Sequence, residues 1–437
     1  MPQEKPSDFR YETGPARVPW AAVGESYEAE DVIEIIRFLI QKSSDEYDAV
    51  FKKVEEDIKE LAKHGKSPSK LSLGEKVSEL EEEVNKFLGA KYSTFVTNAT
   101  AGFEIGYRYA NLEKGDEVIA PAITFIATIS YPLSVGAKVV FADVDPRTIN
   151  MDPEDVERKI TEKTKVIIPV HIGGWPVDMD PIMEIAEKHN LVVIEDAAHA
   201  FGTIYKGRKI GTIGHFGSFS FHEVKNITSF GEGGIVTTKI DEFGEDLKKA
   251  RFLGLDLSRK IKNWLYDVVA LKGKYGYFIA NNHSSTEIQA IGLLTQLRRI
   301  NEIIKIRKKN AEYLTNRFKE NDAIIPQLLD NDDVKSTYHL YLFQIDPEKA
   351  GGDIQKLKQK LAEKGVTNIP HFAPLYKFDV FKKMGYDIES IEKSCPNAEE
   401  VFNRRFTHLP LYPLSSEQLE YMADSILEAV KEMQEGK

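Results

Sequence analysis

The stretch Ser218–Gly234, SFSFHEVKNITSFGEGG, places one lysine, Lys225, between a short run of alternating apolar residues and a glycine-rich turn. The run Ser218–Phe221 predicts a β-strand, and the glycines within Gly231–Gly234 predict a tight turn. An amine held on a loop between such neighbours could bind an aldehyde cofactor as an imine. A single loop lysine is also commonly a solvated surface charge, so its surroundings in the fold decide between these readings.

Strand-like runs and helical patterns alternate around this stretch. The runs rich in apolar or β-branched residues are Thr94–Val96, Glu117–Ala120, Lys138–Phe141, Lys165–Val170, Leu191–Ile194 and Ser218–Phe221. Helical patterns such as Ile182–His189 lie between several of them. The alternation predicts an α/β fold, with a mostly parallel sheet covered by helices on both faces in a three-layer domain. Ligands of such sheets bind beyond the carboxyl ends of the strands, so we expect the chemistry in the residues that follow each strand.

The sequence predicts three parts. Residues 1–70 form an amino-terminal arm and helices, with an amphipathic helix over Glu28–Gln41 and a charged helix within 43–69. Residues 71–285 form the large domain. Residues 286–437 form a helical spine and a smaller α+β carboxyl-terminal domain. The elements expected in this last part are a long helix over Thr286–Glu320, a strand over Tyr338–Ile345, a helix over Gly352–Gly365, a loop over Pro374–Gly385 and a helix over Ser416–Glu435.

Composition is that of an ordinary globular protein, with 437 residues, 42% hydrophobic and 29% charged. The formal net charge of -11 argues against nucleic acid or an anionic membrane as the main partner. The single cysteine, Cys395, excludes an intramolecular disulfide and a cysteine-built zinc site, and no metal site is expected. The first residues lack the apolar run of a secretory signal, so a cytoplasmic protein is expected.

The segment Val118–Ala137 has no formal charge and approaches the length of a membrane span. It contains Pro121 and Pro132 together with several hydroxyl side chains. These residues favour a strand end, a turn and a buried helix over a lipid-facing span.

Two strand ends carry candidate cofactor contacts. After Thr94–Val96, the residues 97–102 include Ala99 and Thr100 and open a helix whose amino-terminal N–H groups suit a phosphate. The same residues also fit a plain helix cap formed by Asn98 or Thr100. After the next strand, Phe125 is placed either to stack on a planar cofactor or to pack in the core.

The next strand ends add a carboxylate, a hydroxyl and an amine. Asp196 follows the apolar run Leu191–Ile194, where a buried acid needs a salt bridge or a cationic ligand. The pyridinium nitrogen of pyridoxal 5'-phosphate (PLP) is such a ligand, and an aspartate opposite it stabilises a carbanion. Ser220 and Lys225 follow the next strand and offer a hydroxyl for the phosphate and an amine for the aldehyde.

An ordered set of motifs extends from about Val77 to the carboxyl terminus. Its stretches are Gly115–Pro121 with Thr124–Thr128, Phe141–Asp145, Ile194–Ala200, Ser220–His222 with Lys225, Gly231–Gly234, Glu287–Ala290 and Leu409–Pro413. In this order the set closely resembles the DegT/DnrJ/EryC1/StrS sugar aminotransferases, PLP-dependent enzymes of fold type I with an aspartate aminotransferase-like fold. The resemblance implies that fold for this chain, with a large PLP-binding domain.

The resemblance also implies roles for individual residues. Lys225 would form the internal aldimine, a Schiff base, and shuttle protons between the cofactor and substrate carbons. Asp196 would pair with the pyridine nitrogen and Phe125 would stack on the ring. His199 would lie near the ring hydroxyl.

The phosphate would be held from both subunits of a dimer. Ala99, Thr100 and Ser220 would bind it from one subunit. Asn282 stands where the family supplies a phosphate contact from the partner subunit, so the resemblance implies a homodimer with shared active sites.

Two residues depart from the family pattern. The family usually has glycine where Ala99 stands and arginine where Ser284 aligns. The second change lies in a substrate-edge segment and leaves the substrate contacts open. The charged helix within 43–69 resembles an insertion.

The resemblance favours transamination, because some relatives that are sugar dehydratases have histidine in place of the lysine that is present here as Lys225. Glutamate or glutamine would give its amino group to a keto sugar, often nucleotide-linked in this group, or to a keto cyclitol, through a ping-pong cycle with a pyridoxamine intermediate. These acceptors stay open, as do two other functions. One is a PLP-dependent dehydratase or lyase on the same fold, and the other is a non-catalytic regulatory relative.

Overall fold

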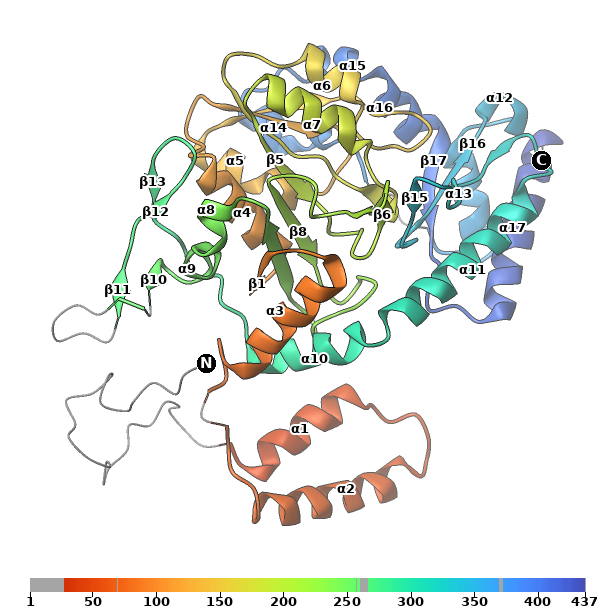
Figure 1. Cartoon of the computed structure of the whole chain (residues 1–437). Coiled ribbons are helices and arrows are strands. Elements are labelled where there is room, and N and C mark those ends of the chain that lie inside the picture. Colours follow the sequence, from red (N-terminus) through yellow and green to blue (C-terminus); the bar gives the residue numbers. More distant parts are fainter. Residues whose placement is uncertain (1–26, 69, 257, 260–265, 369–371, 437) are drawn as a thin grey trace. The chain divides into compact units, whose positions relative to one another are not determined.

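The computed structural model describes residues 27–436 except 69, 257, 260–265 and 369–371 (Figure 1). The chain divides into two compact units, with the boundary between Glu75 and Lys76.

The first unit is a helical hairpin of α1, Ala29–Leu39, and α2, Tyr47–Ala62. One apolar residue of each helix is buried, Ile33 on α1 and Phe51 on α2. Arg37 joins the helices, since its guanidinium donates to Glu55 over 2.7 Å and lies 4.4 Å from the centre of the Phe51 ring. Both predicted helices are confirmed, although the second is shorter than the 43–69 segment.

The second unit is built on a seven-stranded sheet with the order β1-β9-β8-β5-β4-β2-β3. Strands β3, β2, β4, β5 and β8 are parallel, whereas β9 runs antiparallel to both β8 and β1. The prediction of a mostly parallel sheet is confirmed. The strand bounds are β1 Tyr92–Val96, β2 Glu117–Pro121, β3 Lys138–Ala142, β4 Thr164–Ile167, β5 Val192–Asp196, β8 Phe216–Ser220 and β9 Gly234–Thr238.

Helices bury both faces of this sheet, because successive strand residues point to opposite sides. In β5, Ile194 packs in the core beneath α4, while its neighbour Val193 packs in the core formed with α3, α7 and α10. This gives the three layers predicted from the sequence. The helices of the large domain are α3 Glu75–Leu88, α4 Ala99–Tyr109, α5 Ser130–Val135, α6 Pro153–Arg158, α7 Met179–Lys188, α8 Asp241–Gly244, α9 Leu247–Arg251 and α10 Glu287–Leu297.

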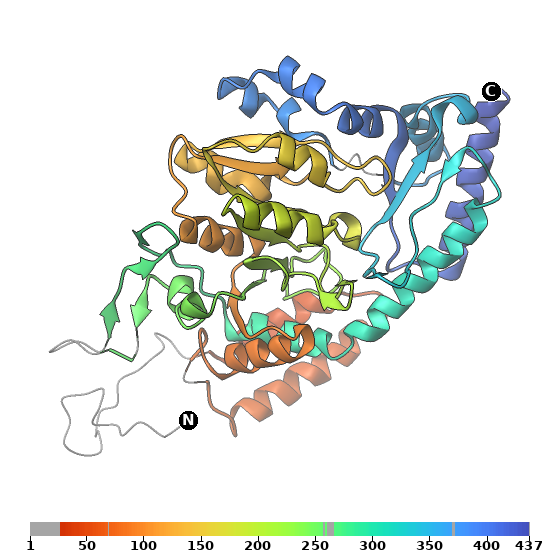
Figure 2. The same cartoon turned by 45° about the horizontal axis from the view of Figure 1, so that its top comes forward.

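A third apolar core belongs to the smaller carboxyl-terminal α+β part, where a three-stranded sheet packs against helices. In both views α17 lies alongside α11 (Figures 1 and 2). The elements are α11 Ile300–Phe318, β14 Ile324–Ile325, β16 Tyr341–Ile345, α12 Pro347–Ala350, α13 Ile354–Glu363, α14 Asp379–Lys383, α15 Ile388–Ser394, α16 Pro396–Glu400, β17 Phe406–Leu409 and α17 Ser416–Gln434. Two-residue strands complete the connections: β6 Ile204–Tyr205, β7 Arg208–Lys209, β10 Leu255–Asp256, β11 Asp267–Val268, β12 Leu271–Lys272, β13 Tyr277–Phe278 and β15 Val334–Lys335.

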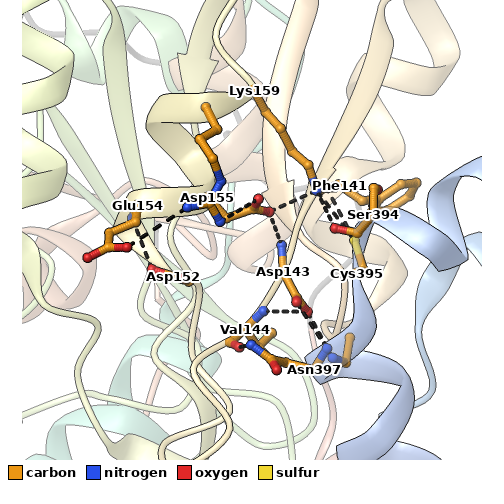
Figure 3. A network of polar contacts seen from close by, with 12 residues as sticks. Phe141, Asp143, Val144, Asp152, Glu154, Asp155, Lys159, Ser394, Cys395 and Asn397 are labelled. Carbon is orange, nitrogen blue, oxygen red and sulfur yellow. Dashed lines mark hydrogen bonds and ion pairs between the residues drawn. The ribbon is translucent and has the colours of Figure 1, made fainter.

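A polar network fixes the start of α16 to the edge of the large sheet (Figure 3). The carboxylate of Asp143, just after β3, accepts from the amides of Asn397 and Ala398 over 3.0 and 2.8 Å. Lys159 donates to the carbonyl oxygens of Phe141 and Ser394 over 2.8 and 3.0 Å. The hydroxyl oxygen of Tyr386 also accepts from the amide of Val139 over 2.9 Å, so the carboxyl-terminal segment occupies a polar group of β3, the edge strand.

Two predicted elements were wrong. The single helix expected over Thr286–Glu320 is two helices, α10 and α11, that end and begin around Arg298 and Arg299. The segment Pro374–Gly385 contains α14 rather than only a loop, because Phe381 turns inward and is fully buried.

Among the described helices, none is both long and apolar enough to cross a bilayer. The uncharged segment Val118–Ala137 is divided among β2, a 3₁₀ turn at Ile126–Ile129 and α5.

Candidate active site

A cavity of about 680 Å³ opens beyond the carboxyl ends of the parallel strands and is closed by residues of the carboxyl-terminal part. Seven of the eight predicted site residues line it, namely Ala99, Thr100, Phe125, Asp196, His199, Ser220 and Lys225. Asn282 does not line it. The sheet thus brings together residues spread over more than a hundred positions, as the rule for strand ends predicts.

Lys225 stands on the loop that follows β8 and is partly buried. Its backbone amide bonds to the carbonyl of His222 over 2.9 Å, which fixes the turn. Its Nζ forms no hydrogen bond or ion pair with any residue that the structure describes. Burial lowers the pKa of this amine to about 8, although the Asp196 carboxylate opposes the shift. The amine is therefore closer to its neutral, nucleophilic form than a surface lysine.

Asp196 ends β5 and is 5% exposed. Its Oδ2 accepts from the hydroxyl of Thr128 over 2.7 Å, and its Oδ1 accepts from the amide of Ala198 over 3.1 Å. Burial raises the pKa of this carboxyl, and these two hydrogen bonds oppose the rise. A buried carboxylate that faces a cavity is stabilised by a cationic ligand there. The Asp196 carboxylate therefore fits a protonated pyridine nitrogen, from which it can accept a hydrogen bond.

The neighbouring acid, Glu195, has a structural role. Its carboxylate points to the other face of the sheet and accepts from the backbone amides of Gly211, Ile213 and Gly214 over 2.6 to 2.8 Å. These three bonds satisfy it within the protein. Alternation along β5 therefore assigns the two adjacent acids to different sides of the sheet.

The amino terminus of α4 forms another wall of the cavity. The side chain of Asn98 caps the helix by accepting from the amide of Ala101 over 3.1 Å, and Ala99 and Thr100 begin the first turn. The N–H groups of a first turn have no partner within the helix and attract a phosphate. Gly234 is required here, because a Cβ atom on it would lie 2.3 Å from the backbone carbon of Asn98.

Two rings lie at the cavity. Phe125 is 59% exposed, so it is not a core residue and its face is available for stacking on a planar ligand. His199 accepts from the amide of Gly173 through Nδ1 over 3.3 Å. Its ring centre is 4.4 Å from that of His339, a buried residue that also lines the cavity.

Asn282 is exposed and does not line the cavity of its own chain. Its Oδ1 accepts from both the amide and the hydroxyl of Ser284, over 3.0 and 2.6 Å. Ser284 therefore holds the orientation of the Asn282 side chain.

The sequence did not reveal the wall contributed by the carboxyl-terminal part. Arg307, His339, His408 and Tyr412 line the cavity from α11, from the segment before β16 and from the region around β17. For Arg307 a signal existed, since Arg307, Ala311, Leu314 and Phe318 recur at helical spacing and are all buried.

Comparisons with known proteins identify the family of this chain. The model of the DegT/DnrJ/EryC1/StrS aminotransferase family matches residues 52–427. The chain belongs to this family. It is an aminotransferase, and its cofactor is PLP.

Individual relatives cover most of the chain. The spore coat polysaccharide biosynthesis protein SpsC of Bacillus subtilis is 34% identical over 84% of this chain and 91% of its own. The UDP-4-amino-4-deoxy-L-arabinose–oxoglutarate aminotransferase of Shewanella sediminis is 32% identical over 78% of this chain and 87% of its own. The PLP form of the putative sugar aminotransferase Spr1654 from Streptococcus pneumoniae superposes with a TM-score of 0.72 at 31% identity, covering 84% of this chain and 94% of that one.

Proposed function

We propose that this aminotransferase moves an amino group from glutamate or glutamine to a keto sugar, nucleotide-linked or free, or to a keto cyclitol. In this proposal Lys225 binds the cofactor covalently. Ala99, Thr100 and Ser220 hold its phosphate, Asp196 pairs with its ring nitrogen, Phe125 stacks on its ring, and His199 lies beside the ring hydroxyl.

The observation that carries the proposal is the pair formed by an unpartnered amine and a buried carboxylate in one cavity. Lys225 Nζ has no hydrogen bond within the described chain, and Asp196 is near enough for its charge to raise the pKa of that amine. A structural lysine would be paired, as Lys159 is with Asp155 over 2.8 Å. An amine held in this way fits covalent chemistry.

PLP, when bound, supplies an electron sink that stabilises negative charge on the carbon next to the transferred nitrogen. The chain's own residues supply the rest. Asp196 would hold the protonated ring nitrogen, since its carboxylate can accept a hydrogen bond from that N–H group. The Nζ atom of Lys225 would take up a proton from the donor carbon and give it up again during the exchange of amino groups.

Asn282 extends the proposal to a homodimer with shared active sites. Asn282 is exposed and does not line the cavity of its own chain, and in this proposal it contacts the phosphate bound by a second copy. The relatives named as sugar aminotransferases support a sugar acceptor, and the presence of Lys225 argues against the histidine-type dehydratases.

Chemical trapping tests the role of Lys225. Borohydride reduction of the PLP-loaded protein should attach the cofactor irreversibly to one lysine, and peptide mass mapping should locate it on Lys225. Lys239 is the control, because burial also lowers the pKa of its amine but it donates to the carbonyl of Ile213. Labelling of another lysine instead of Lys225 would refute the assignment.

The half-reactions test the substrates. Glutamate or glutamine should convert the bound cofactor to its pyridoxamine form, seen as loss of its absorbance near the visible range. The pyridoxamine form is then offered keto sugars, free and nucleotide-linked, and keto cyclitols. If no amino donor gives the first conversion, the aminotransferase assignment to glutamate or glutamine is wrong.

A further inference from the structure

Arg307, on α11, is a buried cation in the wall of the active-site cavity. The residue is 5% exposed and lines the cavity. Its Nη1 donates to the carbonyl oxygen of His339 over 3.1 Å, whereas its buried Nε has no hydrogen-bond partner in the described chain. Its guanidinium lies 5.1 Å from the centre of the Tyr412 ring. No carboxylate among the described residues pairs with it.

A second buried arginine, in contrast, is paired with a carboxylate of the protein. Arg251 is 7% exposed and forms an ion pair with Glu81, itself 3% exposed. Arg307 lacks such a partner, and burial lowers the pKa of its guanidinium to about 10. A buried charge without a counter-charge is destabilising, so an arginine kept in this state fits a site that receives an anion.

The cavity itself offers Arg307 no anion. The acids that line it are Asp196 and Glu232. Asp196 is engaged by Thr128 and Ala198, and Glu232 lies 3.7 Å from Nε2 of His222. The anion must therefore come with a ligand.

The position of Arg307 favours an anion near the reacting amine rather than at the phosphate end. The charges of both Lys225 and Arg307 help to lower the pKa of His339, so both cations lie near one imidazole. In the proposed function the phosphate end lies instead at the amino terminus of α4, where Ala99 and Thr100 begin the first helical turn.

We propose that Arg307 binds the α-carboxylate of the amino-acid donor. The inference rests on the proposed function, in which the donor is glutamate or glutamine. Both amino acids carry this carboxylate, and their keto-acid products keep it, whereas a free keto sugar or cyclitol has no anion. Arginine binds a carboxylate through two parallel hydrogen bonds, which would fix the donor's Cα beside Lys225.

The wild-type protein provides a first test. L-Glutamate is compared with its α-amide, isoglutamine, in the donor half-reaction followed by stopped-flow absorbance. The amide removes only the α-charge, so its apparent Kd should be about 10- to 100-fold weaker. Equal Kd values for the two would overturn the proposal. Absence of conversion with glutamate and glutamine themselves would instead refute the proposed function, so the two failures are distinguishable.

Variants give the second test. R307Q should weaken the Kd of glutamate by a similar factor and abolish the preference for glutamate over isoglutamine, while the Kd of the acceptor changes less than threefold. R307K should lie between R307Q and wild type. The control is K308M, which removes the adjacent cation on α11, paired with Asp330 over 2.7 Å outside the cavity. A loss confined to a nucleotide-linked acceptor would overturn the proposal by assigning Arg307 to a phosphate.

Discussion

Thr128 donates its hydroxyl hydrogen to Oδ2 of Asp196 over 2.7 Å. Because that hydrogen is used, the hydroxyl of Thr124, 2.8 Å from Thr128 Oγ1, must be the donor in the next bond. Both threonines are buried, and the chain of bonds orients the carboxylate toward the cavity. The segment Thr124–Thr128 therefore holds the Asp196 carboxylate in its orientation.

The first prediction concerns this bond. Replacing Thr128 with valine keeps the shape but removes a hydrogen bond that opposes the raised pKa of Asp196. The carboxylate should become harder to ionise, and its pairing with the ring nitrogen weaker. We expect T128V to bind PLP about tenfold more weakly, corresponding to about 1.4 kcal/mol. Equilibrium dialysis measures this affinity. T128S is the control, and equal losses in both variants would contradict the role of the hydroxyl.

A second prediction concerns the close packing of α4 against the sheet. A Cβ atom at Gly102 would lie 2.1 Å from Oγ of the buried Ser218, so α4 must move away from β8. We expect G102A to lose about 1–3 kcal/mol of stability and also PLP affinity, because the helix amino terminus shifts. Thermal unfolding and dialysis measure the two effects. G276A is the control, since its nearest neighbour would be 3.8 Å away. A G102A protein as stable as G276A would contradict the packing argument.

A third prediction concerns acid sensitivity. Burial lowers the pKa of His215 to about 4, and its Nδ1 accepts from the amide of Val193 over 3.0 Å. As the pH falls below 6.5, His215 binds a proton in the unfolded chain but stays neutral in the folded protein. The free energy of unfolding therefore decreases as the pH falls. Between pH 7 and 5 the loss from this group should be about 2 kcal/mol. Urea unfolding of H215N should show a smaller drop over this range, and an unchanged drop would exclude His215 as the cause.

A fourth prediction tests the shared site. In N282D a carboxylate would face the cofactor phosphate of the partner, so PLP affinity should fall strongly. K225A and N282D homodimers should each be inactive. After subunit exchange, half of the dimers are hybrids with one intact site, so activity should recover to about one quarter of wild type. No recovery, despite hybrids detected by native mass spectrometry, would mean that Asn282 serves the active site of its own chain.

The sequence predicted the parallel strands well, because strands buried on both faces are short apolar runs with few alternatives. Strand β9 was missed, since Gly234 opens it and the glycines before it resemble a loop. The break between α10 and α11 at Arg298 and Arg299 was missed because neither proline nor glycine marks it. Arg307 was missed because it lies among lysines. Only its position on the buried face of the helix distinguishes it from these solvated neighbours.

The residues after the strands were predicted together because one topological rule places them at one edge. No such rule predicts the cavity wall that the carboxyl-terminal part contributes through His339, His408 and Tyr412. It depends on how the carboxyl-terminal part packs over the sheet, which local sequence patterns do not specify.

The last prediction concerns the amine of Lys225. Burial lowers its pKa to about 8, and only the neutral amine attacks the aldehyde of PLP. In the apoprotein, the rate of covalent attachment should therefore rise with pH with a midpoint near 8, whereas N-acetyl-lysine, measured in parallel, should titrate near 10.5. The folded pKa lies below the unfolded value, so the unfolded chain binds more protons between these limits, and apoprotein stability should rise with pH across the same window.

Replacing Asp196 with asparagine tests the cause of this shift. The Asp196 carboxylate raises the pKa of Lys225 against the effect of burial. Removing its charge should therefore move the midpoint of attachment below 8, although PLP binds more weakly. Stopped-flow absorbance at several PLP concentrations separates the attachment rate from binding. A midpoint that moves upward in D196N, or a wild-type midpoint near 10.5, would show that Lys225 is not the buried amine beside Asp196 that the structure describes.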